Sequence, residues 1–321
     1  MICKVCEHDI TPKFLLENKK TDNSIYRCPK CKTAFVHPQP SSEELNAFYT
    51  GMYQEKALSF NEVQMNRALK SVKGYLKRLN WIGEKSKGKT FLDLGGGLGY
   101  YSKAASEYGM SPILVEKDAV SVDFAQSKLQ LDTIIQQDLN EFFSSNTDKY
   151  DIVFFRHVIE HVTEPNEVIK NISSLLKDDG VFIIETDNNA GIEILFKKGV
   201  KDFYLKLYGE NFKDISFYKL LSVRPFALDP PRHLFAFRMN NLSNLLKKNG
   251  IKPFIKDHYR LGHPIYWPNI PAPKFSDVIK AFLKFKLKTG IKLTLEYFNL
   301  LFRILLQSLG LSSGLCIYGK K

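Results

Sequence analysis

Hydrophobic and polar positions change their period repeatedly along the chain. Short apolar runs occupy residues 90–93, 113–116, 133–135, 150–155 and 181–184. Stretches with apolar residues at helical spacing follow several of these runs. Because short apolar runs are typical of buried strands, the pattern predicts strands that alternate with helices, as in an α/β fold.

The flanking regions add five predicted elements. Residues 60–82 have apolar residues at helical spacing ahead of the first predicted strand, and residues 250–254 and 315–319 predict the last two strands. Between those strands, residues 275–288 place lysines and apolar side chains on different helix faces, and residues 297–309 carry one charge. These patterns predict a basic helical insertion before the last strand.

Three glycines follow the first predicted strand at alternate positions, Gly95, Gly97 and Gly99, and Asp93 precedes them. The spacing predicts a tight turn between that strand and a helix over residues 100–108. Glycine lets the backbone approach a ligand closely, and a helix N-terminus offers free N–H groups. The turn therefore predicts a nucleotide-like ligand, although several kinds of nucleotide-binding fold contain such a turn.

Two further acidic residues follow the next predicted strands. Glu116 ends the second apolar run, about 20 residues beyond the glycines, where a carboxylate can accept hydrogen bonds from ribose hydroxyls. Asp138 follows the third run. An acid before the glycines and an acid after each of two strands favour a ligand with an amine, a ribose and an adenine over a pyrophosphate.

Over residues 86–190 these features resemble the class I S-adenosylmethionine (SAM)-dependent methyltransferases. The resemblance implies a Rossmann-like, seven-stranded sheet in which the last strand is antiparallel. It also implies roles for the cofactor-binding residues: Asp93 and the backbone of Gly95, Gly97 and Gly99 would hold the methionyl part of SAM, Glu116 the ribose, and Asp138 the adenine edge.

Two Cys-x-x-Cys pairs open the chain, Cys3 with Cys6 and Cys28 with Cys31. Two such pairs about 20 residues apart are a specific zinc pattern, because four thiolates complete a closed tetrahedral site. A closed site leaves no position for a substrate, so the predicted zinc is structural. A redox-active dithiol pair is the alternative, and Cys316 is a residue of the last predicted strand.

The first 45 residues also resemble the ribbon that precedes methyltransferases in bacterial polysaccharide and sugar gene sets. We therefore expect a zinc ribbon at residues 1–45 and a methyltransferase domain at 46–321. Within that domain the cofactor-binding core is expected at about 86–190. The substrate side and the helical insertion are expected at 191–310, with helices over the cleft at 191–240.

His157, Glu160 and His161 directly follow the fourth predicted strand, at a spacing that puts them on one face of a helical turn. The inverted zincin pattern has this sequence, but it requires a helix rather than the end of a buried strand. The segment instead resembles the loop of ubiquinone-pathway O-methyltransferases in which Glu-x-x-Glu-His is linked to a divalent cation. This chain has His157 in place of the first Glu, and the three side chains remain competent cation ligands. Capping of the next helix is the alternative role.

Arg232 and His233 follow two prolines, which fix the backbone ahead of them. The segment resembles the Pro-x-His-x-x-x-Phe stretch of sugar and quinone methyltransferases. His233 is a candidate base or substrate anchor and Arg232 a candidate anion ligand, while a structural histidine is the alternative. We expect His157, His161 or His233 to take a proton from the acceptor.

The net charge of +12 is unevenly distributed. Residues 1–190 carry 23 Lys and Arg against 26 Asp and Glu, a net −3, whereas residues 191–321 carry 23 against 8, a net +15. This excess predicts an anionic partner, namely a phosphate-bearing small molecule, nucleic acid or a membrane surface, and a solvated lysine-rich face is the alternative. With no signal peptide and no run of eighteen apolar residues, we expect a cytoplasmic protein. Residues 275–309 are expected to contact the inner membrane face, a partner chain or the core.

The expected activity is SAM-dependent methyl transfer to a small anionic acceptor, with a sugar or a glycan- or lipid-linked precursor as the leading candidate. A ribosomal RNA base methyltransferase would suit the basic half, but the motif N/D-P-P-Y/F does not follow the fourth strand. A membrane-associated quinone-type O-methyltransferase is a further candidate, and so is a non-catalytic SAM-binding protein.

Overall fold

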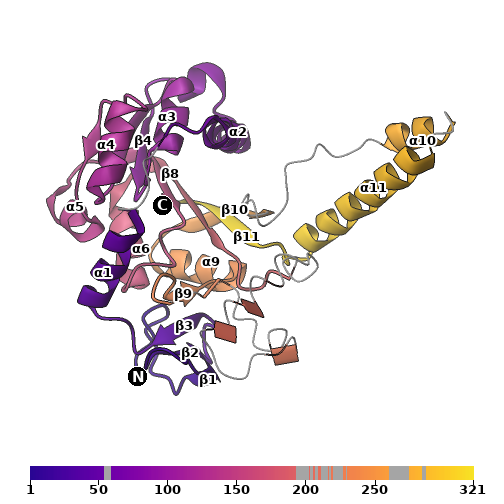
Figure 1. Cartoon of the computed structure of the whole chain (residues 1–321). Helices are drawn as coiled ribbons and strands as arrows, with labels where there is room; N and C mark the ends of the chain where they lie inside the picture. The colour runs from indigo at the N-terminus through magenta and orange to yellow at the C-terminus, as the bar shows by residue number, and fades with distance from the viewer. Residues whose placement is uncertain are drawn as a thin grey trace.

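A computed structural model describes residues 1–53, 59–192, 230–259, 275–283 and 287–321, with isolated positions between 202 and 228 (Figure 1). The helices expected over the cleft at 191–240 therefore lie largely outside the described residues. Within the described part, no helix is long and apolar enough to cross a membrane.

A seven-stranded sheet forms the centre of the molecule, in the order β10-β11-β8-β7-β4-β5-β6. The parallel strands are β4 (Thr90–Leu94), β5 (Ser111–Val115), β6 (Ile134–Ile135), β7 (Tyr150–Arg156) and β8 (Leu176–Asp187). β11 (Gly314–Lys320) pairs antiparallel with both β8 and β10 (Lys252–Tyr259). The prediction of a Rossmann-like sheet with an antiparallel final strand is thus confirmed.

The strand order places the functional motifs at one edge of the sheet. Chain order runs outward from β4 through β5 to β6, then crosses back to β7 on the other side of β4. β4 is therefore the point at which the order reverses, and ligands of open α/β sheets bind beside the carboxyl ends of such strands. The glycine turn follows β4, and the histidine motif follows β7.

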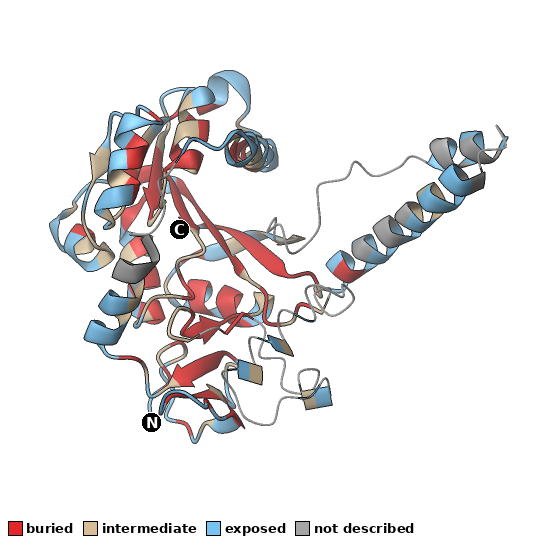
Figure 2. Cartoon of the chain, in the orientation of Figure 1, coloured by how far each residue is buried: buried red, intermediate tan, exposed pale blue. Residues whose placement is uncertain are grey.

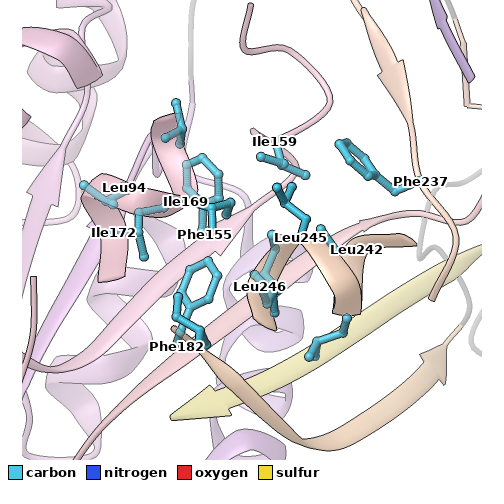
Figure 3. Close-up of a cluster of buried hydrophobic side chains, with 14 of the residues drawn as sticks. Leu94, Phe155, Ile159, Ile169, Ile172, Phe182, Phe237, Leu242, Leu245 and Leu246 are labelled. Atoms are coloured by element: carbon cyan, nitrogen blue, oxygen red, sulfur yellow. The ribbon is translucent and has the colours of Figure 1, made fainter. Parts of the chain in front are cut away.

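Helices cover both faces of the sheet (Figures 1 and 2). One hydrophobic cluster lies between the sheet and the helices α2 (Glu62–Leu79), α3 (Tyr100–Glu107) and α4 (Ala119–Ser127). The other lies against α6 (Pro165–Leu175) and α9 (Met239–Lys248) (Figure 3). Phe155 and Phe182 from the strands meet Ile172 and Leu246 from these helices in that cluster. The short helices α1 (Ser42–Tyr53), α5 (Leu139–Ser145) and the 3-10 turn η1 (Gly83–Ser86) complete this part.

A second, four-stranded sheet is built from two distant parts of the chain. β1 (Lys13–Leu16), β2 (Ser24–Arg27) and β3 (Ala34–His37) form an antiparallel meander near the N-terminus. β9 (Phe235–Ala236) adds the fourth strand by pairing with β3. Cys3, Cys28 and Phe35 belong to the same hydrophobic cluster as Phe155 and Leu246, so the ribbon and the central sheet share a core.

The insertion before the last strand is a pair of helices that projects from the body of the molecule (Figure 1). They are α10 (Phe275–Leu283) and α11 (Leu287–Ser308). The sequence pattern put the second helix at residues 297–309, but it begins ten residues earlier. Gly290 lowers the helix propensity of the first turns of α11, which pack against α10 in the structure.

Candidate active site

The glycine turn after β4 has the backbone conformation that its sequence predicts. Gly95, Gly97 and Gly99 adopt positive φ values of 65°, 55° and 78°. A Cβ built on Gly97 would meet no atom within 4 Å, so this residue faces open space. The turn therefore leaves room for a ligand against its backbone, ahead of the N-terminus of α3.

Asp93 lies beneath this turn rather than beside the open space. Its side chain is buried, and its Oδ2 accepts a hydrogen bond of 2.7 Å from Ser102 Oγ on α3. A Cβ on Gly96 would lie only 2.5 Å from Asp93 Cγ, so the turn folds directly over the carboxyl group. Burial raises the pKa of Asp93 to about 7, against the opposing effect of the Ser102 hydrogen bond.

Glu116 joins the glycine turn from the end of β5. Its Oε2 accepts a hydrogen bond of 2.9 Å from Gly97 N, and its Oε1 accepts bonds from the N–H groups of Lys117 and Asp118. Asp138 lies after β6, where its Oδ1 accepts bonds from Asn140 N and Glu141 N and so caps α5. In the structure Glu116 therefore contacts the glycine turn, whereas Asp138 caps the N-terminus of α5.

The histidine motif contacts the same turn through Val158. A Cβ on Gly95 would lie 3.0 Å from Val158 Cγ2, so the two loops are in close contact. His157 itself adopts a left-handed φ of 51°, which is unusual for a residue other than glycine and occurs preferentially at functional sites. His157 N donates to Glu185 O, which fixes this conformation at the end of β7.

Glu160 is the buried centre of a cluster of ionisable side chains. Its Oε1 lies 3.0 Å from His157 Nδ1, and its Oε2 accepts a bond of 2.9 Å from Thr186 Oγ1. On one side the ligand atoms of Glu160, His157 and Asp187 lie within 4.8 Å of one another, and on the other side those of Glu160, His161 and His233 do so. The expected cation set of His157, Glu160 and His161 is therefore divided between two triads, because the loop forms a turn and not an α-helix.

His161 and His233 stack edge to face, with ring centroids 4.7 Å apart. His161 Nδ1 lies 2.9 Å from Arg232 O, and His233 Nδ1 lies 3.0 Å from Ala227 O. A carbonyl oxygen can only accept, so each Nδ1 carries the hydrogen and each Nε2 keeps its lone pair. Both rings are thus held in the tautomer that leaves Nε2 as the basic nitrogen.

Burial keeps these histidines neutral. It lowers the pKa of His161 and lowers that of His233 well below the usual value, with a further lowering of the latter by His161 and Arg232. For His157, burial and the neighbouring Arg156 lower the pKa to about 4. The same burial raises the pKa of Glu160. Of the causes that lower the pKa of His233, burial is larger than either neighbouring side chain.

A second polar network beside this cluster was not apparent in the sequence. Arg156 Nε donates to Glu185 Oε2 at 2.9 Å, Tyr75 OH donates to Glu185 Oε1 at 2.8 Å, and Arg156 lies over the ring of Tyr101. Tyr259 OH from β10 reaches within 3.4 Å of His157 Nε2. Helix α2 thus contributes the Tyr75 side chain to this network. The sequence indicates this network only through two charged residues, Arg156 at the end of β7 and Glu185 near the end of β8.

The four N-terminal cysteines converge as their spacing predicts. Cys3 Sγ lies 3.9 Å from Cys31 Sγ, and Cys6 Sγ lies 3.8 Å from Cys28 Sγ. A tetrahedral zinc with Zn–S bonds of about 2.3 Å separates its sulfurs by about 3.8 Å. A disulfide would require about 2.05 Å. Cys316 lies apart from this set, in β11.

The strand order, the glycine turn after β4 and the acidic residue after β5 together define a class I SAM-dependent methyltransferase. A model for the family described as "Methyltransferase domain" matches residues 64–253, more than half of the chain, and the chain belongs to this family.

Curated relatives cover different shares of the chain. The ubiquinone biosynthesis O-methyltransferase of Klebsiella pneumoniae is 24% identical over 196 residues, which cover 57% of this chain and 79% of that protein. The protein of the same name from Actinobacillus pleuropneumoniae is 30% identical over 124 residues, which cover 35% of this chain and 53% of that protein. The matched part of this chain therefore covers between about half and about four fifths of the length of these relatives.

Solved structures resemble the chain more distantly. A SAM-dependent methyltransferase from Archaeoglobus fulgidus has a TM-score of 0.47 and 18% identity, and covers 79% of this chain and 94% of its own. The 1,6-didemethyltoxoflavin-N1-methyltransferase of Burkholderia thailandensis has a TM-score of 0.48 and 12% identity, with 97% and 99% covered. These likenesses are too weak to bear on the substrate.

Proposed function

We propose that this methyltransferase acts on a hydroxyl group of a small anionic acceptor, a sugar or a glycan- or lipid-linked precursor. The observation that carries the proposal is the contact between partly buried His161 and buried His233, whose Nδ1 atoms each lie within hydrogen-bond distance of a backbone carbonyl oxygen. An alcohol is a weak nucleophile with a high pKa, so a positioned base assists its attack on a methyl group.

The cofactor would lie against the glycine turn. When bound, SAM supplies an electrophilic methyl group on a sulfonium ion. The open side of Gly97 leaves space for it, and the carboxylate of Glu116 beside Gly97 N is placed to accept hydrogen bonds from ribose hydroxyls. Asp93, buried under the turn, would act by holding the turn and α3 in register. Asp138 is the candidate for the adenine edge.

The contact between Gly95 and Val158 supports placing the acceptor beside the histidines. It joins the cofactor-binding turn to the loop of His157, Glu160 and His161 with no intervening layer. An acceptor hydroxyl next to His161 or His233 would meet a neutral imidazole whose Nε2 can take its proton. The carboxyl group of Glu160, which belongs to both triads, would lie beside the imidazolium that forms.

The net charge of +15 over residues 191–321 supports an anionic acceptor. Transfer of a radioactive methyl group from SAM is the direct test, with nucleotide sugars, polyprenyl-phosphate sugars, catechol-type quinone precursors and ribosomal RNA as parallel substrates. We expect incorporation into a sugar-containing acceptor that is lost in His161→Asn. Incorporation into RNA alone, or SAM binding without transfer to any acceptor class, would contradict the proposal.

A quinone-type O-methyltransferase is the second candidate, and the curated relatives favour it. Those relatives are named ubiquinone biosynthesis O-methyltransferases. Glu160 and His161 also belong to the segment that resembles the cation-linked Glu-x-x-Glu-His loop. The two triads around Glu160 offer a divalent cation mixed nitrogen and oxygen ligands. Methylation of the catechol substrate, abolished by a chelator and restored by a divalent cation, would favour this candidate over the first.

We further infer that Cys3, Cys6, Cys28 and Cys31 bind a structural zinc ion. Their sulfur separations fit tetrahedral coordination, and all four atoms lie within 4.8 Å of one another. The ribbon has three short strands of its own, so metal binding would contribute much of its stability.

A further inference from the structure

Helices α10 and α11 expose an unusual concentration of large apolar side chains. On α11 five of the exposed residues follow one another at intervals of four and three, which places them along one stripe of the helix. These five are Ile291, Leu295, Phe298, Phe302 and Leu305, with exposed fractions of 49%, 65%, 63%, 39% and 51%. Leu301 and Ile304, exposed by 43% and 53%, widen the apolar surface of the helix beyond this stripe. A further three, Phe275, Ile279 and Leu283, are exposed by 58%, 44% and 74% on α10.

The two helices that carry these side chains project from the body of the molecule, and most of their described residues are exposed (Figures 1 and 2). α10 packs on α11, with the rings of Phe275 and Tyr297 5.5 Å apart, and Leu306 is buried near the base of α11. The two helices therefore stabilise each other while presenting their remaining apolar side chains to the surroundings. Monomeric proteins seldom expose so many large apolar side chains side by side unless a partner or a membrane covers them.

The charges on the two helices indicate which of these covers the stripe. Residues 275–309 carry six Lys or Arg and two Asp or Glu, and Lys280 and Lys288 are exposed. A second copy of the chain would bring two positively charged hairpins together. An anionic bilayer would instead neutralise the lysines while its acyl chains receive the apolar stripe. No helix described here can span the bilayer, so the hairpin would lie in its interface.

We propose that α10 and α11 form a membrane-docking arm that inserts its apolar stripe into the interface of an anionic bilayer. The arm leaves the body between β10 and β11, two neighbouring strands of the central sheet. Tyr259, the last residue of β10, lies beside His157. The active site would thus be held close to the lipid surface, whichever acceptor it methylates.

Sedimentation with vesicles tests the arm without any acceptor. The full chain should pellet with phosphatidylglycerol vesicles and only weakly with phosphatidylcholine vesicles. The double variant Leu295→Gln/Phe298→Gln should bind the anionic vesicles at least about tenfold more weakly, because it removes two apolar side chains from the stripe. Val63→Gln on α2 is the matched control, since Val63 is 68% exposed on a helix outside the arm.

The charge contribution has its own variant. Lys280→Gln/Lys288→Gln should weaken binding to anionic vesicles at low salt, and the effect should diminish at high salt because ions screen it. Circular dichroism and SAM binding should be unchanged in each variant, which separates loss of docking from unfolding. Equal pelleting of the wild type and the Leu295/Phe298 variant would overturn the proposal. A concentration-dependent dimer that the same variant dissociates, with no vesicle binding, would assign the stripe to a second copy instead.

Discussion

His161 and His233 come from segments more than seventy residues apart, yet their rings meet with a 69° angle between planes. Arg232 provides the connection, because its carbonyl oxygen accepts the hydrogen bond of His161 while its own successor is His233. The pair therefore behaves as one unit in which each ring depends on the placement of the other.

This arrangement predicts the effect of asparagine at either position. His161→Asn and His233→Asn can keep a donor near the position of Nδ1 but lose the basic Nε2. We expect turnover to fall on the order of 10²-fold or more in each variant, with SAM affinity within a few-fold of wild type. Steady-state kinetics and titration calorimetry provide the two measurements.

His37→Ala is the control for that experiment, since His37 lies in the ribbon and packs on Tyr26. Near-normal turnover in both asparagine variants on the true acceptor would show that catalysis depends on positioning alone.

The lowered histidine pKa values predict the pH profile. A base acts when neutral, so activity is lost as the pH falls through its pKa. Because burial lowers the pKa of both His161 and His233, the acidic limb of kcat/KM should lie below pH 6.5, the ordinary histidine value. A limb centred above pH 7 would point to a different group as the base.

The open side of Gly97 predicts the response to a bulky side chain. Gly97→Val should abolish binding of SAM and S-adenosylhomocysteine by filling the space that the cofactor needs, and NAD should not bind the wild type. Gly88→Val is a matched control, because Gly88 also has a positive φ, 69°, and open space at its Cβ. If both variants lose SAM binding equally in calorimetry, backbone strain rather than cofactor contact is responsible.

Asp93 predicts a pH-dependent stability effect. Its pKa is about 7 in the folded protein and about 3.8 when unfolded, so the folded state binds the proton more tightly. Its contribution to stability is therefore fully present below pH 3.8 and is lost as the pH rises to about 7. Asp93→Asn keeps an acceptor for Ser102 and removes the buried charge. Without SAM, the variant should unfold at a higher temperature than wild type at pH 8, and the difference should shrink towards pH 4. A constant difference across this range would argue against the raised pKa.

The cysteine geometry predicts about one zinc ion per chain. Metal analysis should find it in the wild type and in Cys316→Ser, whose changed residue lies in β11, and not in Cys28→Ser. The latter should also unfold at a lower temperature, because the ribbon loses its metal. A wild type that is folded, active and free of metal would refute the zinc assignment.

The elements that could be predicted from the sequence are those with a local signal. Buried parallel strands such as β4 and β7 appear in the sequence as continuous apolar runs, because helices cover both faces of the sheet and bury both sets of side chains. Gly95, Gly97 and Gly99 signalled a turn, because their conformations are unfavourable for other residues. The paired cysteines likewise revealed their own cluster through spacing alone.

The features that the sequence did not reveal depend on contacts between distant segments. Phe235 and Ala236 form a strand only because β3 lies beside them. The proximity of Asp187 to His157 follows from the register of β7 on β8, which no periodicity encodes. The division of the histidine motif into two triads also depends on a distant segment, because His233 of one triad comes from another loop.

The pairing of β3 with β9 has a consequence for synthesis of the protein. β3 ends at His37 and β9 begins at Phe235, so roughly 200 residues separate the two partners. At about 5–20 residues per second, a ribosome needs on the order of 10–40 s to deliver β9 after β3 has been made. During that interval the outer edge of β3 presents unpaired backbone groups to other nascent chains, a condition under which strands associate wrongly. Early occupation of the edge by a chaperone would therefore favour correct assembly of this chain.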